Sequence, residues 1–244
     1  NAYGKEPGFA GAEGFADLLA LACGVPGLAR IRFMTSHPKD MSEELITLLA
    51  ASNQVCEHVH LPVQSGSDKI LTAMRRGYTR GEYLDLARCL REAVPGMALT
   101  TDLIVGFPGE TEADFEDTLS LVEECGFDGA FTFIYSPRRQ TEAARLPGRL
   151  DPQVARARME RLVDLVQRIG RERNEALVGT VAEVLVEKVS RHAEGEVMGR
   201  TRTHKPVNFA SRTEPGRLVM VELTGATSTS FRGREVPAGT SARC

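Results

Sequence analysis

The clearest hydrophobic pattern in the chain marks one strand, turn and helix near its middle. Leu99–Val105 is a short apolar run with little polar interruption, which is typical of a strand buried on both faces of a parallel sheet. The turn Gly106-Phe107-Pro108-Gly109 follows, and Thr111 with Asp114 then fits a capping box at a helix start. An ordinary βα unit has the same pattern, so the pattern alone leaves function open.

Similar units recur on both sides of this one. Strands are also predicted over Arg30–Thr35, His58–Val63 and Gly129–Tyr135, and each of the first three strands precedes a helix. We expect Asp40 to cap the helix after the first strand, and Thr79 with Glu82 to form a capping box before the third. The pattern predicts an α/β fold with about four parallel βα units, either a partial barrel or an open sheet.

The pattern changes toward the C-terminus. Asp151-Pro152 is a strong helix start, and this helix extends to about Leu177. Short alternating stretches follow and predict a small all-β barrel of the oligonucleotide-binding kind; they are Val181–Val189, Glu196–Arg202 and Leu218–Leu223. We therefore place one domain at residues 1–176 and a second at residues 177–240.

Charge and composition narrow the function classes. The 244 residues carry a net charge of −3, but ten Lys and Arg face seven Asp and Glu from Leu177 onward. An acidic body with a mildly basic tail points weakly to a polyanion-binding appendage. A G-x-x-x-x-G-K-[ST] phosphate loop is absent, as are a signal-peptide pattern and an apolar run of membrane-spanning length. We expect no membrane partner. The sequence does not determine the oligomeric state, for which a monomer is our expectation.

The five cysteines lack close spacing. They are Cys23, Cys56, Cys89, Cys125 and Cys244. No C-x-x-C or similar pair is present, so the spacing predicts neither a zinc nor an iron–sulfur site. We expect structural thiols in a reducing cytoplasm and no metal ligands in this chain.

Small polar groups follow each predicted strand, where α/β folds bind ligands. The pairs Ser36-His37 and Gln64-Ser65 suit hydrogen bonds to a ribose or an amino-acid head group. His58 and His60 share a strand face and, with His37 and Asp102, could bind a metal as in barrel metallohydrolases. The interpretation we favour is that these histidines are strand residues with hydrogen-bonded partners.

One basic stretch lies in the predicted small barrel. Arg200 and Arg202 share a strand face, Lys205 follows closely, and Thr201 and Thr203 add hydroxyls. This composition suits contacts to nucleic-acid phosphates. An exposed basic turn is the alternative.

Five motifs in order and spacing resemble the radical S-adenosylmethionine methylthiotransferases, specifically the MiaB type that acts on tRNA. They are Thr35–Asp40, His60–Ser67, Thr100–Thr111, Phe131–Arg138 and Gly199–Thr203. The resemblance covers nearly the whole chain. It departs after Ser136-Pro137-Arg138, where the family has Pro-Gly-Thr-Pro-Ala and this chain has Arg139-Gln140-Thr141-Glu142-Ala143, which puts local substrate contacts in doubt.

The resemblance implies a radical S-adenosylmethionine partial barrel followed by a TRAM domain that binds RNA. The family carries two 4Fe-4S clusters, whose cysteine ligands would lie upstream of this chain, so we expect a C-terminal fragment that is inactive alone. A 5′-deoxyadenosyl radical removes hydrogen from C2 of N6-isopentenyladenosine beside the anticodon, and a methylthio group is installed. Rival activities are the siblings that act on threonylcarbamoyl-adenosine or on a ribosomal protein, and non-catalytic RNA and cofactor binding.

The resemblance also implies roles for residues. Contacts to S-adenosylmethionine would come from Ser36, Gln64, Ser65, Asp102, Ile104, Gly106, Phe107 and Glu110. Contacts to the phosphates of the tRNA anticodon stem-loop would come from Arg200, Arg202 and Lys205.

Overall fold

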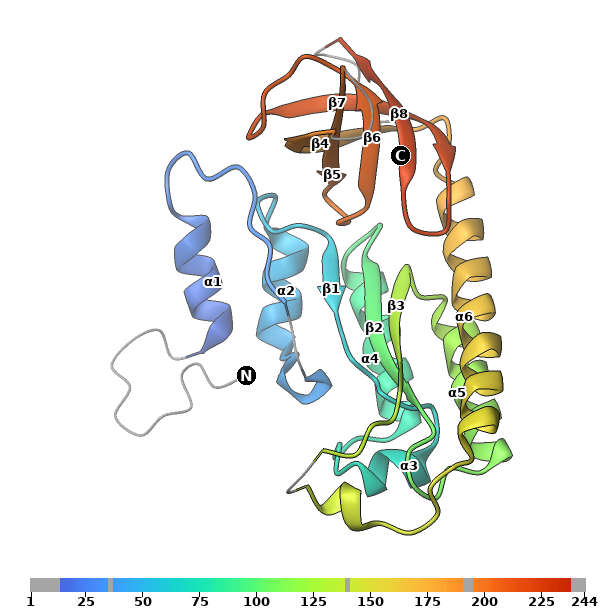
Figure 1. Ribbon diagram of the computed structural model, residues 1–244. Coiled ribbons are helices and arrows are strands. Elements are labelled where there is room, and N and C mark those ends of the chain that lie inside the picture. The colour runs from blue at the N-terminus through green and yellow to red at the C-terminus, as the bar shows by residue number, and fades with distance from the viewer. Residues whose placement is uncertain (1–13, 35–36, 139–140, 191–194, 238–244) are drawn as a thin grey trace. The chain divides into compact units, whose positions relative to one another are not determined.

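The computed structural model describes residues 14–34, 37–138, 141–190 and 195–237. The chain divides into two compact units, Asn1–Val163 and Asp164–Cys244. The first unit holds a parallel sheet with helices and the second holds a closed barrel (Figure 1). One long helix, α6 (Pro152–Glu175), contributes to both units.

The sheet of the first unit has three parallel strands in the order β1 (His58–His60), β2 (Ala98–Val105) and β3 (Gly129–Ile134). The strand predicted over residues 30–35 is not formed by the described part of that stretch. There the backbone makes only an isolated parallel bridge between Ile31 and Val55. The order confirms the parallel βα arrangement but with one regular strand fewer than expected.

Helices separate these strands as the sequence pattern predicts. The helices are α1 (Phe15–Cys23), α2 (Glu43–Ala51), α3 (Asp68–Ala73), α4 (Arg80–Ala93) and α5 (Glu112–Cys125), with short 3₁₀ turns η1 (Pro38–Asp40) and η2 (Glu142–Arg145). Both predicted capping boxes, at Thr79 and at Thr111, are confirmed. The expected cap at Asp40 is wrong because Asp40 ends η1, and the Ser42 side chain accepts a bond from the Leu45 amide instead.

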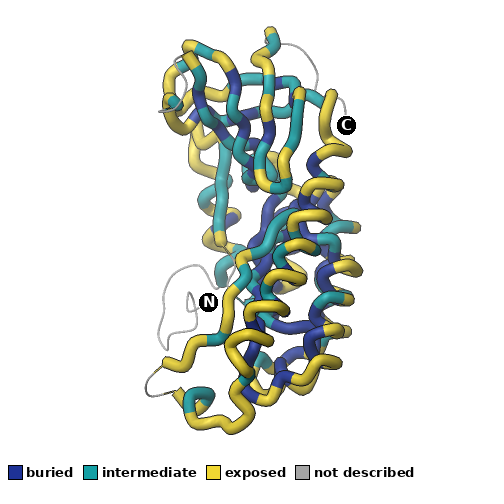
Figure 2. The backbone as a smooth tube through the Cα atoms, turned by 45° about the vertical axis from the view of Figure 1, so that its right-hand side comes forward, coloured by how far each residue is buried: buried dark blue, intermediate teal, exposed yellow. Residues whose placement is uncertain are grey.

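The two faces of β2 differ in burial. Leu99, Leu103 and Val105 are fully buried, whereas Thr100, Asp102 and Ile104 on the other face are half-buried. Figure 2 shows the buried backbone running through the sheet and inner helix turns. Packing against α4 includes the Tyr83 hydroxyl, which donates to the Leu61 carbonyl at 2.7 Å. One face of the sheet therefore packs in the core, and the other remains available to a ligand.

The second unit is a five-stranded closed barrel in the order β4-β5-β6-β8-β7. Its strands are β4 (Val181–Val189), β5 (Glu196–Thr201), β6 (Pro206–Ala210), β7 (Leu218–Ala226) and β8 (Phe231–Val236). Alternating apolar residues such as Val184, Val207 and Phe209 form its core. The small all-β barrel is confirmed, and β6 and β8 are strands that the pattern did not reveal. Among the described residues, no helix is long and apolar enough to cross a membrane.

The loop at Gly66 packs closely against α5, and this contact leads to a testable prediction about stability. A Cβ on Gly66 would lie 2.6 Å from the Cα of Thr118 and would overlap the Asp117 carbonyl. Gly66→Ala should therefore lower the free energy of unfolding by about 1–3 kcal/mol, measured by urea denaturation.

The matched control is Gly81→Ala in the first turn of α4, where the nearest atom to a new Cβ is 3.9 Å away. That change should stabilise the protein by up to about 1 kcal/mol, because alanine is the better helix former. Equal effects of the two substitutions would contradict the close approach at Gly66.

Candidate functional site

A cleft of about 820 Å³ lies in the first unit at the carboxyl ends of β2 and β3. Three of the predicted cofactor residues line it, namely Gln64, Ile104 and Phe107, and Tyr135 joins them. The rest of the lining comes from residues 72–76 and from the segment that contains η2. Ligand sites in parallel α/β folds occur at this edge of the sheet.

Gln64 reaches the cleft because β2 holds its backbone in an unusual conformation. Its φ is +73°, in the left-handed region that non-glycine residues rarely adopt. The backbone amide of Gln64 donates to the backbone carbonyl of Asp102 at 2.9 Å, and the backbone carbonyl of Gln64 accepts from the amide of Ile104 at 2.9 Å. These bonds continue the parallel pairing beyond β1 and fix where the side chain begins.

Two aromatic rings form one wall of the cleft. Phe107 and Tyr135 meet edge to face, with ring centroids 5.2 Å apart. The Tyr135 hydroxyl is buried and has no hydrogen-bond partner among the described residues. A buried polar atom without a partner costs free energy, so this hydroxyl is suited to a ligand that enters the cleft.

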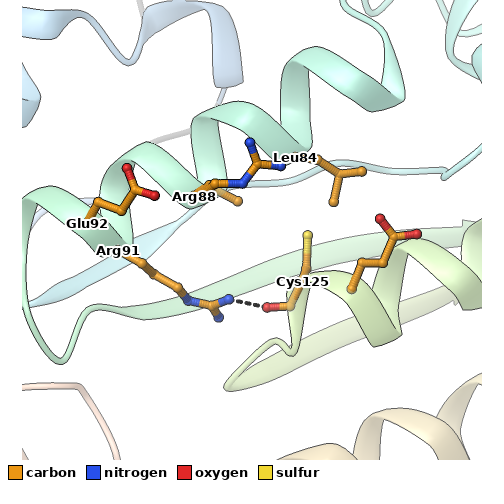
Figure 3. Close-up of a pocket in the computed structure, with 7 residues that line it drawn as sticks. Leu84, Arg88, Arg91, Glu92 and Cys125 are labelled. Carbon is orange, nitrogen blue, oxygen red and sulfur yellow. Dashed lines mark hydrogen bonds between the residues drawn. The ribbon is translucent and has the colours of Figure 1, made fainter.

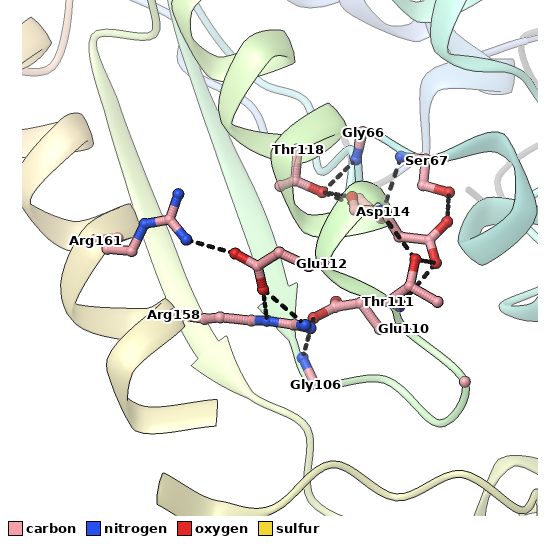
Figure 4. A network of polar contacts seen from close by, with 12 residues as sticks. Gly66, Ser67, Gly106, Glu110, Thr111, Glu112, Asp114, Thr118, Arg158 and Arg161 are labelled. Carbon is pink, nitrogen blue, oxygen red and sulfur yellow. Dashed lines mark hydrogen bonds and ion pairs between the residues drawn. The ribbon is translucent and has the colours of Figure 1, made fainter. Parts of the chain in front are cut away.

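The turn that carries Phe107 is anchored by Glu110. Gly106 has a φ of +78°, and its amide donates to Glu110 Oε1 at 3.1 Å. Arg158 of α6 donates to the same oxygen at 2.6 Å and also pairs with Glu112 (Figure 4). Burial raises the pKa of Glu110, although the bonds from Arg158 and the Gly106 amide oppose that shift. Glu110 therefore acts on the cleft through the turn rather than lining it.

A second buried carboxylate ties the neighbouring loop to the start of α5. Asp114 accepts a bond from the Ser67 hydroxyl at 2.7 Å and one from the Thr111 amide at 2.8 Å (Figure 4). The Lys69 ammonium donates to the same carboxylate at 2.7 Å. Burial raises the pKa of Asp114, but these bonds outweigh it and hold the pKa well below its usual range. Lys69 also donates to the Gly109 carbonyl at 2.8 Å, which joins this network to the turn.

Two other predicted cofactor residues lie outside the cleft lining. Ser65 is buried, and its hydroxyl lies 3.4 Å from the Thr118 hydroxyl and accepts a bond from the Ser67 amide. Asp102 faces His60 at 3.3 Å on the half-buried face of the sheet. Ser36 lies outside the described residues.

The two strand histidines bond to neighbouring strand residues. His58 Nε2 and His60 Nδ1 lie 3.1 and 3.0 Å from the Thr100 hydroxyl, respectively. Within the described ranges, no three His, Cys, Asp or Glu residues converge as a metal site would require. The hydrogen-bonded interpretation of these histidines therefore agrees with the contacts that the structure shows.

A further hollow of about 420 Å³ lies between α4 and α5, separate from the cleft at the carboxyl ends of the strands (Figure 3). Arg91 donates to the Cys125 and Gly126 carbonyls and so satisfies the C-terminal end of α5. Burial raises the pKa of the Cys125 thiol to about 12. A thiol with so high a pKa is a poor nucleophile at neutral pH, which fits the structural role expected for this cysteine.

The basic stretch of the second unit forms the end of β5 and the turn into β6. Arg200 is half-buried, pairs with Glu187 at 3.1 Å and donates to the His204 carbonyl. Arg202 is half-buried as well. Lys205 is only 6% exposed, and its ammonium donates to Asn174 of α6. Both arginines are partly exposed, although Arg200 already has protein partners, whereas Lys205 is buried and its ammonium bonds inside the unit.

Sequence comparison agrees with this division of the chain. Residues 10–122 match the profile of the Radical SAM superfamily, and residues 175–236 match that of the TRAM domain. The chain combines a radical SAM segment with a TRAM domain. The cleft is lined partly by residues of the radical SAM match and partly by residues that follow it in the chain, such as Tyr135. Arg200 and Arg202 lie within the TRAM match.

Three relatives share the name tRNA-2-methylthio-N(6)-dimethylallyladenosine synthase. The protein from Moorella thermoacetica is 52% identical over 97% of this chain and 53% of its own length. Those from Clostridium botulinum (strain Loch Maree) and Natranaerobius thermophilus are 48% and 47% identical, over 97% and 96% of this chain and 52% and 51% of their own lengths. The chain thus spans about half the length of these relatives.

Among solved structures, the chain is similar to coproporphyrinogen III oxidase from Escherichia coli, a radical SAM enzyme. It is 12% identical, with a TM-score of 0.49, over 83% of this chain and 50% of that chain.

The Asp114 network predicts a pH-dependent stability. Its lowered pKa means that the ionised carboxylate stabilises the folded state above the unfolded pKa of about 3.9 and that this contribution is lost as the pH falls. Asp114→Asn should therefore lower the free energy of unfolding at pH 7 by about 1.5–3 kcal/mol, measured by urea denaturation.

The difference between wild type and Asp114→Asn should shrink as the pH falls below about 4, because protonation removes the same charge from the wild type. Asp117→Asn is the control, since Asp117 is an exposed acid on the same helix. A difference that stays constant from pH 7 down to pH 2 would contradict the proposed charge network.

Proposed function

We propose that this protein takes part in methylthiolation of tRNA at C2 of N6-dimethylallyladenosine, also called N6-isopentenyladenosine, beside the anticodon. The observation that carries the proposal is 52% identity over 97% of the chain to a protein named as the synthase of that nucleoside. The radical SAM profile and the cleft at the strand ends support the same activity.

The cleft has the chemistry that S-adenosylmethionine needs. Ile104 and Phe107 provide an apolar wall for an adenine ring, and Gln64 adds an amide. The Tyr135 hydroxyl, buried without a described partner, offers a hydrogen bond to a polar atom of the bound molecule. We assign Gln64, Ile104 and Phe107 as direct contacts, while Gly106 and Glu110 shape the turn.

The described residues do not fit an iron–sulfur cluster. Cys23, Cys56, Cys89 and Cys125 are separate free thiols, and none joins a group of three potential ligands. The proposed reaction therefore requires cluster ligands from outside the described residues, and no step assigned to this chain passes through a cluster.

When bound, S-adenosylmethionine supplies the radical chemistry that an unactivated C2–H bond of adenine demands. The residues of this chain hold and orient the reactants. Phe107 and Tyr135 shield one side of the cleft from water, and the Glu110–Arg158 pair keeps the Phe107 turn in place. Fixed positions of this kind matter because small misplacements of a reactant cost large factors in rate.

For the TRAM domain, we propose binding of tRNA through phosphate contacts from Arg200 and Arg202. Lys205 supports the same turn from inside through its bond to Asn174. We propose residues 1–176 as the radical SAM part and 177–240 as the RNA-binding part. We also propose a cytoplasmic location, because the proposed substrate is tRNA.

The direct test is nucleoside mass spectrometry of tRNA from cells that lack the full-length gene. We expect 2-methylthio-N6-isopentenyladenosine to vanish and N6-isopentenyladenosine to accumulate, with both restored by the wild-type gene. Unchanged levels of the two nucleosides would contradict the proposed substrate. Loss of a methylthio group from threonylcarbamoyl-adenosine or from a ribosomal protein would instead identify a sibling activity.

The TRAM assignment makes a second prediction. Arg200→Ala with Arg202→Ala should weaken binding to an anticodon stem-loop RNA and flatten the plot of log affinity against log salt by about two units, since each lost phosphate contact accounts for about 0.9. Fluorescence anisotropy at several salt concentrations measures both quantities.

The control is Arg232→Ala with Arg234→Ala, which removes two arginines from β8 of the same barrel, where they pair with Glu196 and Glu222. An effect on the salt dependence as large as that of the Arg200 and Arg202 pair would contradict a local phosphate site.

A further inference from the structure

Two phenylalanines stand exposed on the edge strand of the sheet. Phe131 and Phe133 of β3 are 63% and 51% exposed. They alternate along the strand and therefore point to the same face. In the parallel register, Phe131 lies opposite Asp102 and Phe133 lies opposite Ile104. Large exposed aromatic residues side by side often mark a binding surface.

The surroundings of these rings combine apolar and polar chemistry. The His60 ring meets Phe131 edge to face, with centroids 6.0 Å apart, and His60 in turn lies 3.3 Å from Asp102. Thr100 holds His60 through its hydroxyl. The rings therefore lie beside a positioned polar group that can recognise the edge of a bound base.

This surface adjoins the candidate cofactor cleft. Ile104 lines the cleft and is the register partner of Phe133 on the next strand. Neighbouring strands are about 4.8 Å apart. A ligand group that contacts the Phe133 ring therefore lies within van der Waals reach of one that contacts Ile104. A substrate that rests on the two rings would therefore place its reactive atom next to the cleft.

We propose that Phe131 and Phe133 bind the N6-dimethylallyl-adenine of the tRNA and determine specificity for its apolar N6 substituent. This inference rests on the function proposed above. Phenyl rings stack on a purine and also favour a hydrocarbon tail. Asp102, opposite Phe131 in the register, disfavours a substituent that carries a carboxylate, such as threonylcarbamoyl.

The test measures the affinity of the full-length protein for three anticodon stem-loop RNAs by fluorescence anisotropy. Their target adenosine is unmodified, N6-dimethylallylated or N6-threonylcarbamoylated. We expect wild type to bind the dimethylallylated RNA about tenfold or more tightly than either of the others. Phe131→Ala with Phe133→Ala should reduce that preference to about twofold or less. Every RNA loses the stacking of its purine on the rings, but the dimethylallylated RNA also loses the contacts of its apolar substituent and is therefore weakened most.

Two further variants separate this role from a general loss of structure. Ile134→Ala removes a side chain that is 45% exposed on the opposite face of the same strand, and it should keep the full preference. Phe131→Leu with Phe133→Leu keeps apolar side chains at both positions and should retain part of the preference for the dimethylallylated RNA. A cooperative thermal unfolding transition near that of the wild type shows that each variant is folded.

The inference is overturned if the double alanine variant keeps the wild-type preference, or if Ile134→Ala loses it equally. Either result leaves the proposed function intact, because wild type still selects the dimethylallylated RNA. If wild type shows no preference for that RNA, the proposed substrate is wrong and the inference falls with it.

Discussion

Two buried carboxylates at the turn between β2 and α5 determine the geometry of the candidate site. Burying a carboxylate costs several kcal/mol unless a cation and hydrogen-bond donors compensate it. Here Arg158 from α6 pairs with Glu110, and Lys69 from α3 pairs with Asp114. Each of these ion pairs anchors a separate helix next to the turn. The turn is therefore held from two sides, and Phe107 projects from it into the cleft.

Local signals allowed much of this arrangement to be predicted from the sequence. The strand before Gly106 and the helix after Thr111 carry their own patterns, so both elements and their capping box lie where expected. Gln64 follows from the rule that ligands bind at strand ends, whereas Ile104 and Phe107 follow from the family resemblance. All three line the cleft. The part each takes in binding a cofactor stays a prediction.

Contacts between distant residues account for what could not be predicted. Arg158 comes from a helix that begins after a long connection, and its burial against Glu110 has no signal in the local pattern. Ser65 follows Gln64 directly, but its hydroxyl turns to Thr118, because the left-handed backbone at Gln64 redirects the chain. β6 is short, and its parallel pairing with β8 joins segments that are separated in the sequence. The ammonium of Lys205 likewise meets Asn174 of α6 rather than solvent.

The proposed binding of S-adenosylmethionine in the cleft beside Phe107 is tested most directly by a crystal structure of the full-length protein grown with that molecule. We predict adenosine density against Ile104 and Phe107, with a polar atom within hydrogen-bond distance of the Tyr135 hydroxyl. Density for the adenosine at another site, with the cleft filled only by solvent, would contradict the claim.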